Sequence, residues 1–285
     1  MTTGKLYIVA TPIGNLQDIT LRALETLKMV DLIAAEDTRH SKKLLAHYGI
    51  DTPLISLHDY NESEQSKVLL AKLQVGKNLA LISDAGTPLI SDPGYRLVHM
   101  VRNENIIVVP IPGACAAICA LSASGLASDR FTFEGFLPAK STQRISRLEK
   151  LQSETRTMIF YESPHRIIDS LNAMLAIFGS ERKVVYAREL TKTFETIHEA
   201  SLQDICEWVK SDTNQQKGEI VILIAGLENI VTDMATEEAR RILNILSSEL
   251  LGSKAVEITR KILNNSVSKK AIYQLMLGQL VDKNM

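Results

Sequence analysis

The stretch from Ser83 to Gly94 constrains the fold of this chain more than any other. It holds two glycines, two prolines and two aspartates within twelve residues. It follows a short apolar run at residues 78–82, which predicts a buried strand, and precedes an amphipathic segment at residues 95–102, which predicts a helix. Open α/β sheets present ligand-binding groups at their carboxyl edge in this order of strand, glycine loop and helix. On its own, the loop also fits a tight structural turn.

Strand-like and helix-like segments alternate through residues 1–122, which predicts an α/β domain with a mostly parallel, doubly wound sheet. The expected strands lie at residues 5–10, 31–36, 53–57, 78–82 and 106–111. Three of them run into loops rich in glycine and proline, at residues 11–14, 84–88 and 112–114. Such convergence favours a ligand cleft. None of the loops matches the dinucleotide fingerprint or the P-loop, so a dinucleotide or a nucleoside triphosphate is disfavoured.

The pattern changes after residue 122, and residues 123–228 predict a second α/β domain. Its strands contain more threonine and aromatic residues, which indicates a mixed sheet. They are expected at residues 130–136, 157–161, 183–188 and 219–225, with a basic helix at 140–156.

Residues 229–285 are helix-like throughout. Helices are expected at 236–247, at 253–263 with Ser253 as the N-cap, and, after a turn at 264–266, at 267–280 with Lys269 and Lys270 near its start. This arrangement is similar to a small helix-turn-helix unit that binds nucleic acid. A helical cap that packs or dimerises fits equally well.

Composition limits the classes of function. The net charge of −1 argues against a protein that coats nucleic acid by bulk charge, although it allows a local basic patch. No apolar run approaches the ~20 residues that span a bilayer, and the first residues show no signal-peptide pattern. The three cysteines are odd in number, and their use favours a reducing cytoplasm. They also lack zinc-ligand spacing with histidines, so we expect no metal site.

Two clusters of basic residues are candidates for contacts with RNA phosphates. The first follows the second expected strand and consists of Arg39, Lys42 and Lys43. The second recurs at intervals of three on the basic helix and consists of Arg144, Arg147 and Lys150. A solvated helix face is the more ordinary explanation for either cluster taken singly.

Seven segments in order carry a resemblance to a known family. They lie at residues 7–16, 35–39, 83–94, 112–116, 133–138, 161–166 and 187–192. Together they resemble the tetrapyrrole methylase-like family, and within it the methyltransferases of small-subunit ribosomal RNA, over essentially the whole chain. The resemblance implies two α/β domains with the cofactor in the cleft between them, followed by a helical tail.

The resemblance also implies an activity and its setting. It implies methylation, dependent on S-adenosylmethionine, of the 2′-oxygen of a cytidine in the decoding region of 16S rRNA, by a cytoplasmic homodimer that acts on the small ribosomal subunit. Two alternatives stay open. One is a methylase of a tetrapyrrole or another small molecule, which would not require the basic clusters and the helical tail. The other is a non-catalytic protein that binds RNA or the ribosome, against which the three Gly/Pro loops speak.

The family's cofactor contacts carry over to the three loops and to two strand ends of the second domain. The first loop matches the family's pattern only at Pro12 and Gly14, and Cys115 replaces a hydroxyl residue of the family. The cofactor-binding residues that the resemblance implies are Pro12, Asp84, Gly86, Thr87, Pro112, Gly113, Cys115, Ala116, Glu162, Ala225 and Gly226.

Methyl transfer from a sulfonium requires that a hydroxyl be aligned with the methyl group, and a group that takes the hydroxyl proton assists it. Candidates for this base follow strand ends: Asp37, Asp59, Glu162, His165 and Glu189. We favour Glu189, because Arg188 and Lys192 beside it could pair with phosphates. An ordinary surface ion pair is the competing explanation. The expected substrate-binding residues are Arg39, Lys42, Lys43, Arg188 and Lys192.

Overall fold

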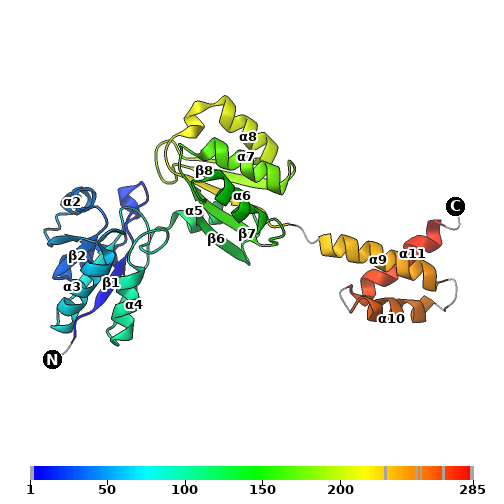
Figure 1. Cartoon of the computed structure of the whole chain (residues 1–285), viewed down its shortest axis with the longest axis horizontal. Helices are drawn as coiled ribbons and strands as arrows, with labels where there is room; N and C mark the ends of the chain where they lie inside the picture. The colour runs from blue at the N-terminus through cyan, green and yellow to red at the C-terminus, as the bar shows by residue number, and fades with distance from the viewer. Residues whose placement is uncertain (1–2, 228–229, 248–249, 251, 265–266, 283–285) are drawn as a thin grey trace. The chain divides into compact units, whose positions relative to one another are not determined.

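The structure is a computed structural model of the chain, and it describes residues 3–227, 230–247, 250, 252–264 and 267–282. The chain divides into two compact units, which meet between Ala225 and Gly226. The larger unit contains two five-stranded sheets and the smaller one is helical (Figure 1). Each unit is described by itself.

The first sheet is parallel throughout, as the alternating pattern predicts. Its order is β3-β2-β4-β1-β5. The strands are β1 (Leu6–Val9), β2 (Leu32–Ala35), β3 (Leu54–Ser56), β4 (Leu79–Ile82) and β5 (Val108–Ile111). The connection after β1 runs toward β2, whereas the connection after β4 runs the other way, toward β5. The carboxyl ends of β1 and β4 therefore form the switch point at which open sheets bind ligands.

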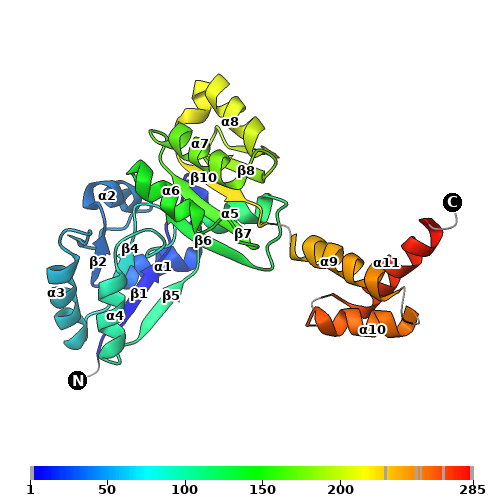
Figure 2. The same cartoon turned by 45° about the vertical axis from the view of Figure 1, so that its right-hand side comes forward.

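Two pairs of helices cover the two faces of this sheet. α1 (Leu21–Met29) and α2 (Thr38–His47) bury Leu27 and Leu45 on one face. α3 (Glu62–Gln74) and α4 (Tyr95–Asn103) lie side by side on the other (Figure 2). Because helices cover both faces, the sheet is doubly wound, and the apolar residues on both faces of its strands are buried.

The second sheet is mixed, as predicted. Only β6 (Phe131–Phe136) and β7 (Thr157–Glu162) pair in parallel. The remaining pairs are antiparallel and add β10 (Ile220–Ile224), β8 (Lys183–Arg188) and β9 (Thr196–Ser201), in that order. β9 is not predicted from the sequence, because this edge strand is only partly covered and carries no apolar run.

The two faces of the second sheet are covered differently. α6 (Ser141–Glu149), α7 (Ile167–Phe178) and α8 (Leu202–Ser211) cover one face, where Phe160 and Tyr186 are fully buried. α6 is shorter than the basic helix expected at 140–156. α5 (Ala116–Ala123) covers the other face, and its alanines allow a close approach to β7 and β10. By packing, α5 belongs with the second sheet, although the sequence division at residue 122 assigns it to the first domain.

The C-terminal unit consists of α9 (Ile230–Leu246), α10 (Gly252–Ile262) and α11 (Lys269–Asp282). They enclose a small core around Leu243, Val256 and Ile272. α9 begins earlier than expected, and Ser253 lies inside the first turn of α10 rather than at its cap. The expected boundary at residues 228–229 and most of the turn at 264–266 lie outside the described residues. No helix in the described part of the chain is long and apolar enough to cross a membrane.

The loop after β5 passes close to the end of β1 at Gly113, and a substitution there tests this close approach. A Cβ added there would lie 2.8 Å from the Cβ of Ala10. We expect Gly113→Ala to lower the free energy of unfolding by about 1–3 kcal/mol, because the packing leaves no room for the methyl group. Urea unfolding measures this decrease. Combined with Ala10→Gly, the substitution should cost less than the sum of the two single changes. Additive costs would contradict the close packing of the two residues.

Candidate active site

The three Gly/Pro loops meet at the carboxyl edge of the first sheet. Thr11 and Gly86 exchange two backbone hydrogen bonds, with N–O distances of 2.9 and 3.1 Å. The hydroxyl of Thr87 donates to the carbonyl of Ala114 at 2.9 Å. Gly86 has a φ of +81°, a conformation that glycine adopts without strain. The loops after β1, β4 and β5 are therefore held together at the switch point.

A cavity of about 340 Å³ lies beside the three loops. Its volume and its largely apolar walls are typical of small-molecule sites. The first half of the larger unit contributes Ile13, Ala85, Gly86, Thr87, Ile90, Ser91, Asp92, Cys115 and Ala116. The second half contributes Phe136, Tyr161, Glu162, Ser163, Pro164, Gly218, Glu219, Ile220 and Val221.

Five of the expected cofactor-binding residues line this cavity: Gly86, Thr87, Cys115, Ala116 and Glu162. Four others belong to the three loops but are not among the residues that line the cavity: Pro12, Asp84, Pro112 and Gly113. Asp84, for example, accepts a hydrogen bond from the backbone N–H of Asp37 at 3.0 Å. Cys115 precedes α5, and its side chain makes no capping hydrogen bond to that helix.

The structure does not place Ala225, one of the expected cofactor-binding residues, at this cavity. β10 runs antiparallel to β7, so that Ile220 pairs with Glu162 and Ile224 with Met158. The start of β10 therefore borders the cavity. Ala225 lies at the other end of the strand, where its N–H donates to the carbonyl of Lys183 at 3.0 Å. Gly226 follows it and belongs to the C-terminal unit.

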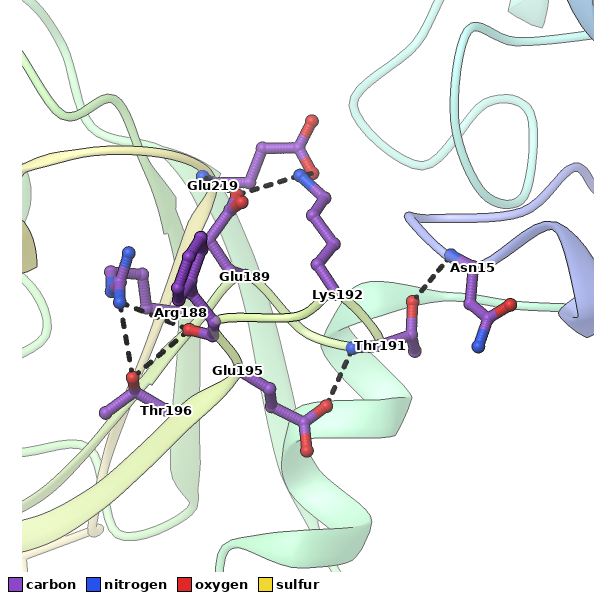
Figure 3. Close-up of polar contacts among 9 residues, drawn as sticks. Asn15, Arg188, Glu189, Thr191, Lys192, Glu195, Thr196 and Glu219 are labelled. Atoms are coloured by element: carbon purple, nitrogen blue, oxygen red, sulfur yellow. Dashed lines mark hydrogen bonds and ion pairs between the residues drawn. The ribbon is translucent and has the colours of Figure 1, made fainter.

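Glu189, the favoured base, is held in an ion-pair network (Figure 3). Its Oε1 accepts hydrogen bonds from Lys192 Nζ at 2.8 Å and from the backbone N–H of Glu219 at 2.9 Å. Burial raises its pKa, but these two bonds and the charges of Lys192 and Arg188 outweigh burial and lower the pKa overall. A carboxylate with a lowered pKa is a weak proton acceptor. Glu189 is also absent from the cavity lining, so its geometry indicates a role in holding the loop.

Arg188 and Lys192 hold the same loop and are not free to bind phosphate. The guanidinium of Arg188 is buried and donates to Gln215 Oε1 at 3.0 Å, to the carbonyl of Phe194 at 3.1 Å and to Thr196 Oγ1 at 3.3 Å. Lys192 bridges the carboxylates of Glu189 and Glu219 (Figure 3). This corrects their expected role as substrate-binding residues.

The loop at residues 189–195, between β8 and β9, joins the two halves of the larger unit. The hydroxyl of Thr191 accepts the backbone N–H of Asn15 at 3.0 Å, and the N–H of Thr191 donates to Glu195 at 2.7 Å (Figure 3). Gly14 packs so closely that an added Cβ would lie 2.4 Å from Lys192 Cγ. Thr191 has a φ of +67°, which costs energy in a β-branched residue and persists because its surroundings fix it.

The two basic clusters differ in exposure. Lys42 and Lys43 are exposed on α2, and Arg39 is exposed but paired with Asp37 at 3.1 Å. Arg144 is buried and lies 3.7 Å from Asp169. Arg147 pairs with Glu134. Arg144, Arg147 and Lys150 therefore do not form a continuous row of exposed cations that could contact RNA phosphates, because α6 directs Arg144 toward the interior.

Asp92 is a cavity residue that the sequence pattern does not single out. Burial raises its pKa to about 7, and the charges of Glu36, Asp84 and Asp59 add to the effect, whereas the nearby Ser83 hydroxyl lowers it. The strand-end pattern favours Asp84, two residues after the end of β4, and not an aspartate eight residues further along. The signal for Asp92 in the sequence is its place in the loop that also contains Gly86 and Pro88.

The other proposed bases are less well placed. A hydrogen bond from the Arg39 side chain and others from the α2 backbone lower the pKa of Asp37 to about 2. Asp59 and His165 are exposed outside the lining. Among the residues that the structure describes, no three His, Cys, Asp or Glu side chains form a group that could hold a metal ion.

Thr191→Val tests the junction between the two halves. The substitution removes the acceptor of the Asn15 N–H and preserves the shape of the side chain. We expect the free energy of unfolding to fall by about 0.5–1.5 kcal/mol, measured in urea. Thr142→Val, on the exposed face of α6, is the matched control and should change it by less. Equal effects of the two substitutions would mean that the junction contributes nothing.

Comparison with known proteins identifies the family. The model of the tetrapyrrole (corrin/porphyrin) methylases matches residues 5–206. A ribosomal RNA small subunit methyltransferase I of Haemophilus influenzae is 55% identical over 98% of both chains. The protein of the same name from Pseudomonas aeruginosa is 53% identical over 97% of this chain and 98% of its own.

Solved structures support the fold. Uroporphyrin-III-C-methyltransferase from Thermus thermophilus superposes with a TM-score of 0.56 at 18% identity, over 81% of this chain and 98% of its own. Diphthine synthase superposes with a TM-score of 0.58 at 13% identity, over 78% of this chain and 90% of its own. Because the family model and relatives that match nearly end to end agree, the chain belongs to the tetrapyrrole methylase family and, within it, to the ribosomal RNA small subunit methyltransferase I proteins.

Proposed function

We propose that this chain methylates the 2′-oxygen of a cytidine in the decoding region of 16S rRNA, within the small ribosomal subunit. The observation that carries the proposal is the 55% identity, over 98% of both chains, to a relative named for methylation of small-subunit ribosomal RNA. The cytidine and the 2′-oxygen are the finer part of the proposal and rest on the resemblance of the sequence motifs. We further propose that the protein acts in the cytoplasm as a homodimer.

Methyltransferases of this family use S-adenosylmethionine, and the cavity fits such a cofactor. Its apolar walls suit an adenine ring, and the backbone of its loops offers polar atoms. Phe136 and Tyr161 both line the cavity, and their ring centroids lie 5.7 Å apart. Aromatic faces attract cations such as a sulfonium. The bound cofactor would supply a methyl group activated by its positively charged sulfur.

The residues around the cavity bind, orient and exclude water. In our proposal, Gly86, Thr87 and Ala116 hold the cofactor from one side and Ile220 and Val221 from the other. Fixing the reactants in this way contributes a large part of the rate enhancement of a displacement reaction.

Tyr161 positions α5, whose first turn borders the cavity. Its hydroxyl accepts the N–H of Ala117 at 3.0 Å. Burial raises the pKa of Tyr161, so the hydroxyl stays protonated and is not a base.

The RNA contacts that we propose are few. Lys42 and Lys43 are exposed on α2, which begins at the carboxyl edge of the first sheet, and we assign them to phosphates of the substrate. A net charge of −1 suits an enzyme whose substrate is presented by an assembled particle rather than wrapped by the protein.

The direct test is methyl transfer from labelled S-adenosylmethionine to small subunits that lack the modification, followed by nucleoside analysis. We expect the label in 2′-O-methylcytidine. Label in another nucleoside would overturn the finer proposal and leave RNA methylation standing. Cofactor binding without labelled RNA would favour a small-molecule methylase.

The lysines of α2 give a second prediction. Lys42→Ala with Lys43→Ala should weaken binding to small subunits and reduce the slope of log Kd against log salt by about 1 for each phosphate that a lysine no longer neutralises. The matched control is Lys28→Ala with Lys72→Ala, which removes the same charge from the last turns of α1 and α3, at the other edge of the sheet. An equal effect of both pairs would show that charge alone, and not this position, matters.

A further inference from the structure

We propose that Asp92 is the catalytic residue that takes the proton of the ribose hydroxyl during methyl transfer. This inference rests on the proposed function and deepens it by naming the proton acceptor. It stands on the position of Asp92 in the cavity, on the carboxylates that surround it and on the loop that holds it.

Three carboxylates border the cavity: Asp92, Glu162 and Glu219. The Glu162 side chain is 1% exposed, and both of its oxygens are engaged: Oε1 by the N–H of Ser163 and by Arg166, and Oε2 by the hydroxyl of Ser170. The Glu219 side chain is 68% exposed and pairs with Lys192 at 3.0 Å. Asp92 therefore remains as the cavity carboxylate that can accept a proton.

The turn that carries Asp92 is fixed by its surroundings. Glu62 is buried, and its Oε1 accepts the backbone N–H groups of Gly94 at 3.0 Å and Arg96 at 2.9 Å. Leu89 and Ser91 have φ values of +73° and +69°, which are unfavourable for both residues. Strain of this kind persists where packing enforces it, and it concentrates at functional sites.

The charges that face Asp92 come from the ends of three strands, and one of these strands, β4, also precedes Asp92 itself. Glu36 follows β2, Asp59 lies in the loop after β3 and Asp84 follows β4. From the remaining sides, the Ser83 hydroxyl, which donates to the carbonyls of Ala85 at 3.3 Å and Gly86 at 3.4 Å, lies close enough to lower the pKa of Asp92, and Tyr161 of β7 lies within its electrostatic reach. Burial comes first and the like charges second in raising the pKa of Asp92 to about 7. A base with a pKa near the working pH is the most effective acceptor, because it is ionised and still binds a proton well.

Methyl transfer forms one bond and breaks another. The ribose oxygen forms a bond to the methyl carbon, and the bond between that carbon and sulfur breaks. The bonding electron pair stays on sulfur, which becomes a neutral thioether, and the hydroxyl proton passes to an Oδ atom of Asp92. The carboxyl group then returns the proton to water. Because Asp92 must be ionised to accept the proton, kcat should rise with pH through about 7.

The test compares isosteric variants with small subunits as substrate. Asp92→Asn should lower kcat by about 100- to 10,000-fold, with little change in KM, and the residual rate should lose its dependence on pH near 7. Calorimetry should show S-adenosylmethionine bound within threefold of the wild-type affinity. Glu64→Gln, an exposed carboxylate in the first turn of α3, is the matched control and should leave kcat unchanged.

Glu36→Gln supplies a second variant that retains the base. Removing this charge should move the acidic limb of the kcat profile to lower pH, by roughly one unit, while the plateau rate is kept. The carbon-13 resonance of the Asp92 carboxyl, assigned by its disappearance in Asp92→Asn, should titrate near pH 7 in the wild type and at lower pH in Glu36→Gln.

Two results would overturn the inference: Asp92→Asn with kcat within threefold of the wild type, or an Asp92 carboxyl that titrates near pH 4. Both are distinct from a failure of the proposed function, which would show as absence of 2′-O-methylcytidine with the wild-type enzyme. In that case this inference falls with it.

Discussion

The two hydrogen bonds between Thr11 and Gly86 are the contact on which the rest of the site depends. They join the loops after β1 and β4, the neighbouring strands whose connections leave in opposite directions. A parallel sheet opens a crevice at this point, and the bonds fix its floor. Thr87 then anchors the third loop through Ala114. The cavity therefore follows from the topology of the first sheet, and its chemistry follows from the residues of three short loops.

The second half of the larger unit completes the cavity, and two features hold it there. α5 leaves the loop after β5 and packs its alanines on the second sheet, together with Ile13 from the loop after β1. On the other side, Thr191 in the loop at residues 189–195 accepts a hydrogen bond from the backbone N–H of Asn15. The network of Glu189, Lys192 and Arg188 stabilises that loop (Figure 3). These charged residues suggest catalysis or phosphate binding in the sequence, but in the structure they hold a loop that fixes one side of the site.

The sequence predicts the two sheets and the meeting of the three loops, because buried parallel strands are continuous apolar runs and their loops share one edge. Prediction fails where the outcome depends on tertiary direction. Ala225 would lie at the cavity only if its strand ended there, but β10 is antiparallel to β7. Arg144 recurs with the spacing of an exposed face, but the rotation of α6 buries it. Asp92 acquires its raised pKa from burial in the folded protein and from the carboxylates that the ends of β2, β3 and β4 bring together.

The cavity between the loops and the second sheet is, in our proposal, the site that holds S-adenosylmethionine. Calorimetry with Ala116→Leu tests this most directly, because Ala116 lines the cavity at the start of α5. Ala123→Leu places the same side chain at the exposed end of that helix and serves as the control. We predict that Ala116→Leu weakens binding at least about tenfold, since the added side chain fills space that the cofactor needs, and that Ala123→Leu leaves it unchanged. Wild-type affinity in Ala116→Leu would contradict the assignment of the cavity.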